Sequence, residues 1–429
     1  MVAMRDSATF RSLRHRNARI VFFGLIVSNV GSWMQITAVS LLVYRLTGKG
    51  TDVGITLFCQ FLPMLVLGVW AGALADRVDK RKMAICTQAG LAVQALVLGT
   101  VDLAGHATLA VVWSLSLVLG VVNALDNPAR RGFIVELVES PDIPNVLALN
   151  TAVMTGSRIF GPAIAAILVK PIGTGWLFII NGASFVAILL PMIRINRSEL
   201  HPSPPASRGG QPVREALRYV SRSRRMFVLF VCFTVVGTFA FNYNVSLLKL
   251  ADDRFGDKTL FGWLLAATSV GSLIGSLVTA GRHRVGFRWF FASMILLGAS
   301  GFAVAWSPSI WVAYLVSVPL GAGGAALIAA LNGISQVGAP PAMRGRLLAL
   351  GAVAFLGTTP IGGPVTGWVA DNVSAEWSLA YGSAITLVTA AFGILARSRS
   401  TRAEVPGGEH RGAASFIDDG DGGGVVVER

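Results

Sequence analysis

A polar stretch, Gly72-Ala73-Leu74-Ala75-Asp76-Arg77-Val78-Asp79-Lys80-Arg81-Lys82, separates two long apolar runs, residues 52–75 and 83–104. Its last seven residues hold four cations and two carboxylates. Each flanking run has the roughly 20 residues that an α-helix needs to cross a bilayer. The stretch is therefore predicted to be a tight hairpin at a membrane surface.

The hairpin combines small residues with a carboxylate at a helix end. Gly72, Ala73 and Ala75 would let another helix approach closely, and Asp76 could then meet the positive N-terminal end of that helix. The alternative is a solvated loop that only anchors its two helices.

Composition places the whole chain in a membrane. Of the 429 residues, 53% are apolar and 14% are charged, and the mean hydropathy is +0.64. A soluble protein of this size needs a larger polar surface. The net charge of +14 would suggest nucleic acid for a soluble chain, but here it indicates Lys and Arg gathered on one membrane side, so no nucleic-acid partner is expected.

Twelve apolar runs are long enough to cross the bilayer, and a polar segment divides them into six and six. The sequence thus predicts an all-α membrane protein with two six-helix bundles. The predicted parts are an N-terminal arm (1–19), a first bundle (20–193), a central loop (194–225), a second bundle (226–396) and a disordered tail (397–429).

The distribution of basic residues gives the orientation. With the N-terminus inside, the inner segments hold 29 Lys and Arg and the outer loops hold 6. This asymmetry predicts that both termini are cytoplasmic.

An internal repeat joins the two bundles. Residues 161–165 (Gly-Pro-Ala-Ile-Ala) match residues 363–367 (Gly-Pro-Val-Thr-Gly) at an offset of about 202 residues. Parallel repeats of this kind occur in transporters that bind substrate between their halves.

The hairpin resembles the signature loop of the major facilitator superfamily, although Asp79 stands where many members have Gly. The resemblance implies a conformational-lock loop that holds the halves together in the outward-facing state. Asp76 would receive the N-terminus of the eleventh helix, just after Arg346. The residues of this predicted loop are Gly72, Leu74, Asp76, Arg77, Lys80, Arg81 and Lys82.

Arg158 is the one Lys or Arg near the middle of a predicted span. A guanidinium at that depth must be paired or face water, which makes it a candidate for substrate or proton handling. A structural ion pair with Asp126, near Asn123, is the alternative. Polar residues inside the apolar runs, among them Asn29 and Gln35, and aromatic residues such as Trp33, Tyr243 and Phe355 are further candidates for a cavity wall.

Gly156, Gly161 and Pro162 resemble the fifth-helix motif of the superfamily's exporters, with Ala165 and Ala166 where paired glycines are expected. A plain packing kink is the alternative. Trp33-Met34-Gln35, Asp126-Asn127-Pro128-Ala129-Arg130 and Arg158 together resemble the branch that contains the enterobactin exporter and bacterial drug:proton antiporters.

The branch implies a monomeric, proton-driven exporter of a lipophilic or amphipathic small molecule, drug-like or siderophore-like, in the bacterial inner membrane. Import is an alternative direction. A non-transporting membrane enzyme or sensor is the alternative class, but the sequence contains no phosphate-binding loop and no metal-ligand or nucleophile motif. No enzyme activity, cofactor or metal is therefore predicted.

Overall fold

The computed structural model describes residues 8–75, 77–201, 212–282, 285–356 and 359–403, and within them every regular element is a helix. The first half of the chain contains the short 3-10 helices η1 (Ala8–Arg14) and η2 (Ser140–Asp142) and the helices α1 (Arg16–Thr47), α2 (Gly50–Ala75), α3 (Lys80–Leu103), α4 (Leu109–Glu136), α5 (Ile143–Ser184) and α6 (Val186–Arg194). The second half contains α8 (Arg224–Ala240), α9 (Tyr243–Asp253), α10 (Leu260–Ala280), α11 (Phe287–Ala305), α12 (Ile310–Val337), α13 (Pro341–Leu356), α14 (Thr359–Asn372) and α15 (Ala375–Ala403). Between the halves lie η3 (Arg197–Glu199) and α7 (Pro212–Arg222).

In the described part of the chain, eleven helical segments are long and apolar enough to cross a membrane, and one of them, Ser140–Arg194, contains two crossings. Gly173 adopts a φ of 77°, which breaks α5 in its middle. Before the break, Asn145 bonds Ser12 near the start of the chain, and after it the Met192 carbonyl returns to Arg81 of the hairpin. The chain therefore goes out and back, and the predicted fold of twelve crossings is confirmed.

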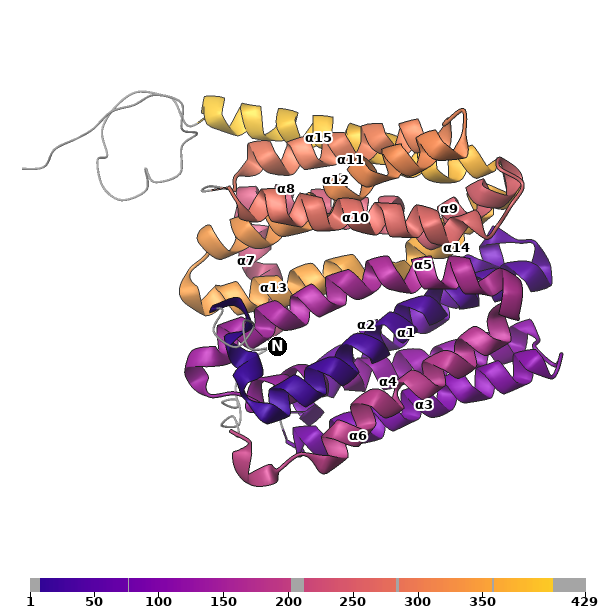
Figure 1. Cartoon of the computed structure of the whole chain (residues 1–429). Coiled ribbons are helices and arrows are strands. Elements are labelled where there is room, and N and C mark those ends of the chain that lie inside the picture. Colours follow the sequence, from indigo (N-terminus) through magenta and orange to yellow (C-terminus); the bar gives the residue numbers. More distant parts are fainter. Residues whose placement is uncertain (1–7, 76, 202–211, 283–284, 357–358, 404–429) are drawn as a thin grey trace, which may run out of the picture.

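The halves form two helical bodies, with α8 to α15 above and α1 to α4 and α6 below in Figure 1. They meet where α2 packs on α14 and where α5 packs on α10. A Cβ atom added at Gly54 would lie 2.3 Å from the Gly363 carbonyl oxygen, so α2 and α14 touch backbone to backbone. A Cβ atom at Gly262 would lie 2.6 Å from the Pro162 carbonyl oxygen, so α10 and α5 do the same.

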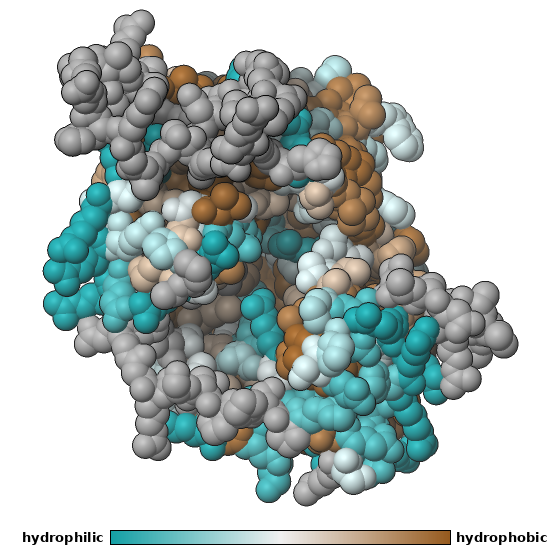
Figure 2. Space-filling model, turned by 90° about the vertical axis from the view of Figure 1, so that its left-hand side faces the viewer, coloured by the Kyte–Doolittle hydropathy of each residue, from teal (hydrophilic) through white to brown (hydrophobic). Residues whose placement is uncertain are grey.

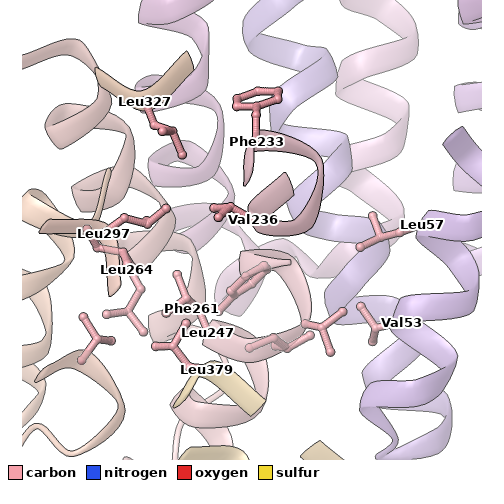
Figure 3. Packing of buried hydrophobic residues seen from close by; sticks show 14 of the residues in the cluster. Val53, Leu57, Phe233, Val236, Leu247, Phe261, Leu264, Leu297, Leu327 and Leu379 are labelled. Atoms are coloured by element: carbon pink, nitrogen blue, oxygen red, sulfur yellow. The ribbon is translucent and has the colours of Figure 1, made fainter. Parts of the chain in front are cut away.

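Buried apolar residues fill the space around these contacts. Figure 3 shows Leu247 and Phe261 of the second half in one packed cluster with Val53 and Leu57 of α2. All four side chains are at most 4% exposed. The two halves therefore share part of their core, and this shared core fixes where the helices that carry the functional residues cross.

Two predicted boundaries differ from the structure. The helix α15 continues to Ala403, so residues 397–403 of the predicted disordered tail are helical. The eleventh crossing begins at Pro341 rather than after Arg346, because proline is favoured in the first turn of a helix. Residues 404–429 of the tail lie outside the described part of the chain.

Candidate functional site

The hairpin between α2 and α3 holds its own half together. Asp76 lies outside the described residues, so its predicted contact with the eleventh helix stays a prediction. Gly72 has open space where a Cβ would be, and Arg77 is exposed. Asp79 accepts a hydrogen bond from the Lys82 amide at 3.0 Å and so caps the N-terminus of α3, which explains a carboxylate at this position.

Two further cations of the hairpin bind neighbouring helix ends. Lys80 forms an ion pair with Glu136 at the end of α4, with 2.9 Å between Nζ and Oε1. Arg81 is buried and donates to the carbonyl oxygens of Met192 and Ile193 at 2.7 and 2.8 Å. These carbonyls belong to the last turn of α6 and lack partners within the helix. The described part of the loop, in which Leu74 is half-buried, thus joins α3 to α4 and α6.

Asp126 belongs to a polar cluster between α3 and α4. Its carboxylate accepts hydrogen bonds from Thr87 and Gln88, both at 2.8 Å, and pairs with Arg130 at 2.9 Å. Asp126 therefore does not form the ion pair with Arg158 that was considered above as an alternative; both residues lie in the described part of the chain. The spacing of Asp126 and Arg130, one helical turn, was the signal in the sequence for the pair that does form.

Three other candidates from the sequence lie in helix contacts of the first half. Gln35 donates to Gln94 at 2.9 Å and accepts from Asn181 at 2.6 Å, which ties α1 to α3 and α5. Asn29 donates to the Leu25 carbonyl of its own helix at 2.8 Å, and the Asn123 carbonyl accepts from Asn127 at 3.0 Å. None of these bonds reaches Arg158.

Arg158 occupies a different environment. It is 15 residues from the start of α5 at Ile143 and 15 from the break at Gly173, which places it about 22 Å from each end at 1.5 Å per residue. Its side chain is nevertheless exposed. Phe160 and Ile167, which are 60% and 56% exposed, project 160–200° away on the helix at about 100° per residue. Arg158 therefore faces the interior of the protein, where solvent reaches it.

One aromatic residue from each half lies near this guanidinium. Its carbon Cζ lies 4.7 Å from the ring centroid of Trp33 on α1. Tyr243, at the start of α9, is close enough to interact with it electrostatically. The Tyr243 hydroxyl is buried and forms no hydrogen bond with any described residue. Phe241 packs between Tyr243 and Phe355, with ring centroids 5.9 and 5.1 Å away.

The seventh crossing is interrupted at this site. The helix α8 ends at Ala240 and α9 begins at Tyr243, so Phe241 and Asn242 form a break within the crossing. Helices interrupted near the midplane form the substrate sites of several transporter folds. Among the described residues, the site that results combines one cation, an aromatic wall and an unpaired hydroxyl. The sequence indicated Arg158 by its depth, but it did not show that Tyr243 would lie beside it.

The fifth-helix motif lies beside the site. A Cβ atom at Gly161 would lie 2.5 Å from the Trp33 Cβ, so Gly161 allows α5 to pack tightly on α1. Pro162 contributes the carbonyl oxygen against which Gly262 packs, while Gly156 has open space around its Cα. The motif thus provides close contact on two sides of α5, to the first half and to the second.

Charged residues join the halves at the end opposite the hairpin. Asp371, at the end of α14, accepts hydrogen bonds from the amides of Gly50 and Thr51 at 2.7 and 2.8 Å and from the Thr51 hydroxyl at 2.7 Å. Lys249 lies 3.6 Å from the same carboxylate. We call these four residues the outer closure, where outer means only the end of the molecule opposite the hairpin. No signal in the sequence indicated them, since the partners are about 320 residues apart.

Two more contacts reinforce the outer closure. The Lys249 ammonium lies over the Tyr44 ring of α1, 5.4 Å from its centroid. Lys170, at the outer part of α5, pairs with Asp257, in the turn before α10, at 2.7 Å. At the hairpin end, Figure 2 shows a surface that is hollowed near its centre, with hydrophilic residues to the left and lower right and hydrophobic residues to the upper right. The interior is therefore closed at one end and open at the other.

Comparisons with known proteins agree with this architecture. Residues 7–417 match the family model described as transmembrane secretion effector. The uncharacterized MFS-type transporter YfiS of Bacillus subtilis is 23% identical, with 63% of this chain and 66% of that protein covered. The staphyloferrin A transporter of Staphylococcus aureus is 22% identical (60% and 64% covered), and the multidrug efflux pump Tap of Mycolicibacterium fortuitum is 25% identical (82% and 88% covered). The match thus spans just under two thirds of the first two relatives.

Solved structures show the same fold. A bacterial homologue of the human lysosomal transporter Spinster superposes with a TM-score of 0.65 at 14% identity, covering 89% of this chain and 96% of that one. The nucleoside transporter NupG superposes with a TM-score of 0.69 at 13% identity, covering 91% and 100%. Since the family model covers nearly the whole chain, this multi-pass membrane protein belongs to the transmembrane secretion effector family of the major facilitator superfamily, a family of transporters rather than enzymes.

Proposed function

We propose that this protein is a proton-coupled exporter that binds a lipophilic or amphipathic small molecule between its halves, beside Arg158. The observation that carries the proposal is Arg158, a residue that solvent reaches in the middle of a membrane crossing, with Trp33 against its guanidinium and the unpaired Tyr243 hydroxyl nearby. Inserting an arginine at that depth costs at least about 2.5 kcal/mol, so it is retained where it has a function.

The chemistry of the site favours a substrate with two parts. The guanidinium attracts a carboxylate, a phenolate or another hydrogen-bond acceptor, and it can bind a carboxylate through two parallel bonds. Phe241, Tyr243 and Phe355 offer an apolar wall for a ring or an alkyl chain. An anionic or acceptor-rich amphipathic molecule fits both. A siderophore-like compound is one such class, and the relative named as a staphyloferrin A transporter supports it.

Alternating access would move the substrate. In this structure the outer closure joins the halves at one end and the hairpin end is open. The hairpin end carries most of the Lys and Arg, which supports a cytoplasmic location for it and for both termini in the bacterial inner membrane. The structure then corresponds to an inward-facing state. Asp76, received by the start of α13, would hold the halves together in the outward-facing state.

Proton coupling and a monomeric state complete the proposal. Asp126, which forms an ion pair with Arg130, is one candidate carrier. Asp76 is the second candidate carrier on the cytoplasmic side.

Transport in everted membrane vesicles tests the proposal. Vesicles with an acidic interior should accumulate a fluorescent amphipathic anion when they contain the wild-type protein, and Arg158→Gln should reduce accumulation to the level of empty vesicles. Phe160→Leu, two residues further along α5 and facing lipid, should transport normally. Wild-type rates in Arg158→Gln would contradict the proposed site. Accumulation in right-side-out vesicles alone would show import instead.

A further inference from the structure

The helix α7, in the segment between the two halves, has the pattern of an interfacial helix. Ala216 and Val220 are buried, whereas Leu217 is 52% exposed. Arg214, Arg218 and Arg222 follow one another at intervals of four residues and so share one face of the helix. A basic amphipathic helix of this kind lies in the plane of the membrane interface. It belongs to the cationic hairpin end of the molecule, where α8 begins.

A cavity of about 1100 Å³ runs from α7 along α8, with α13 as its other wall. Arg214 and Arg218 lie at one end, and Phe227, Val231 and Val235 line its length. Phe227 and Val231 are 50% and 42% exposed. Three buried residues of α8, Leu229, Phe233 and Val236, lie on the other side of the helix, at 180–240° from Phe227. The groove therefore opens toward the lipid rather than toward Arg158.

The depth of the groove matches one leaflet of a bilayer. Val235 lies 11 residues beyond Arg224, the first residue of α8, which corresponds to about 16 Å of helix. The hydrocarbon core of a bilayer is about 30 Å thick, so the groove ends near the midplane. An acyl chain of the leaflet at the hairpin end would fill the groove along its length.

The charge at the mouth of the groove selects the headgroup. Glu215, which also lines the mouth, forms an ion pair with Arg346 of α13, so its charge is compensated. Among the described residues, the Arg218 guanidinium forms no ion pair. Arginine binds phosphate oxygens through charge-assisted hydrogen bonds. We propose that this groove binds one anionic phospholipid of the leaflet at the hairpin end, with its phosphodiester group at Arg214 and Arg218 and an acyl chain along Phe227 and Val231.

Such a lipid would contact α8 and α13 together, which are the hairpin-side parts of the seventh and eleventh crossings. It would thus connect two helices that border the open end of the interior. The inference does not depend on which molecule the protein transports.

Native mass spectrometry of the full chain released from detergent tests the inference. Phosphatidylglycerol and phosphatidylcholine with identical acyl chains are added separately, and inorganic phosphate serves as the third probe. We expect one phosphatidylglycerol to be retained per chain, at least about tenfold more strongly than phosphatidylcholine, and no retained phosphate. Equal retention of the two lipids, or binding of phosphate alone, would overturn the proposal.

Variants separate the groove from general electrostatics. Arg214→Gln combined with Arg218→Gln should abolish the preference for phosphatidylglycerol. Val231→Trp fills the groove and keeps both arginines, and it should also lose the lipid; its exposed position makes it compatible with folding. Arg16→Gln combined with Arg19→Gln removes the same charge from exposed positions at the start of α1 and should retain the lipid. Retention by Val231→Trp, or equal loss in the α1 variant, would refute the groove as the binding site.

Discussion

Under the proposed alternating access, replacing Asp371 by asparagine should shift the protein from the state joined at the outer closure, which the proposal assigns as inward-facing, to the outward-facing state. The wild-type carboxylate accepts three hydrogen bonds, from the Gly50 amide and from the amide and hydroxyl of Thr51. It also faces Lys249 at 3.6 Å. Asparagine keeps one oxygen acceptor and loses the charge, so at least one bond disappears and the attraction to Lys249 is lost.

The size of the shift follows from these contacts. A hydrogen bond to a charged group contributes about 1.5–3 kcal/mol to stability. Because the hydrogen bonds of Asp371 join the two halves, the loss of one of them destabilises the closed outer end and leaves the contacts within each half intact. Because 1.4 kcal/mol corresponds to a factor of ten, the ratio of outward-facing to inward-facing molecules should rise roughly tenfold to a hundredfold.

Spin labels on the outer loops measure this ratio. Cysteines in place of His106 and Pro308, which are exposed on opposite halves, would be labelled in a chain whose native Cys59, Cys86 and Cys232 are replaced by serine. Pulsed electron paramagnetic resonance should show a population at longer distance in Asp371→Asn. Asp79→Asn makes the same chemical change at the N-terminus of α3, within one half, and should leave the distances as in the wild type. An unchanged distribution in Asp371→Asn, or an equal change in Asp79→Asn, would refute the role of the outer closure.

Three further predictions concern other contacts. Tyr243→Phe removes a hydroxyl that has no described partner, so the protein should unfold at the same temperature or slightly higher, while a substrate that bonds the hydroxyl should bind about two- to tenfold more weakly by calorimetry. Gly54→Ala places a methyl group 2.3 Å from the Gly363 carbonyl oxygen, which should destabilise the inward-facing state by about 1–3 kcal/mol. The spin-label distances should therefore lengthen. A lower unfolding temperature with unchanged distances would contradict this, because it would mean that both states are destabilised equally. Burial raises the pKa of Asp257, but hydrogen bonds from Lys170 and Thr259 outweigh this and hold the pKa below its usual range. The Lys170–Asp257 pair therefore stabilises the closed outer end equally at pH 7 and at pH 5. Its contribution, about 0.2–1 kcal/mol for so exposed a pair, should disappear only below about pH 4. A loss of closure between pH 7 and pH 5 that is absent in Lys170→Gln would contradict this.

The sequence predicted the elements better than their contacts. Apolar runs and the hairpin predicted the number of crossings, because length and hydropathy are local properties. Depth alone identified Arg158. The ion pair of Asp126 with Arg158, considered as the alternative for Arg158, does not form, since a charge one turn away on the same helix competes with any charge on another helix.

The outer closure could not be predicted, because it depends on how α14 meets α2. A carboxylate at the end of one helix and an uncapped N-terminus elsewhere are common in any chain, and nothing local pairs them. The same applies to Tyr243, which looks like any other aromatic residue until the break between α8 and α9 brings it near Arg158. The lock predicted for Asp76 stays a prediction.

The glycine crossing of Gly54 and Gly363 has a consequence for how such a protein diversifies. This crossing consists of main-chain atoms, so no side chain at the crossing itself has to change its rotamer when the two helices separate. The residues proposed to bind the substrate lie on α1, α5 and α9, away from the crossing of Gly54 and Gly363. Under the proposed function, mutations of these residues can therefore change the substrate while the helix crossing stays the same.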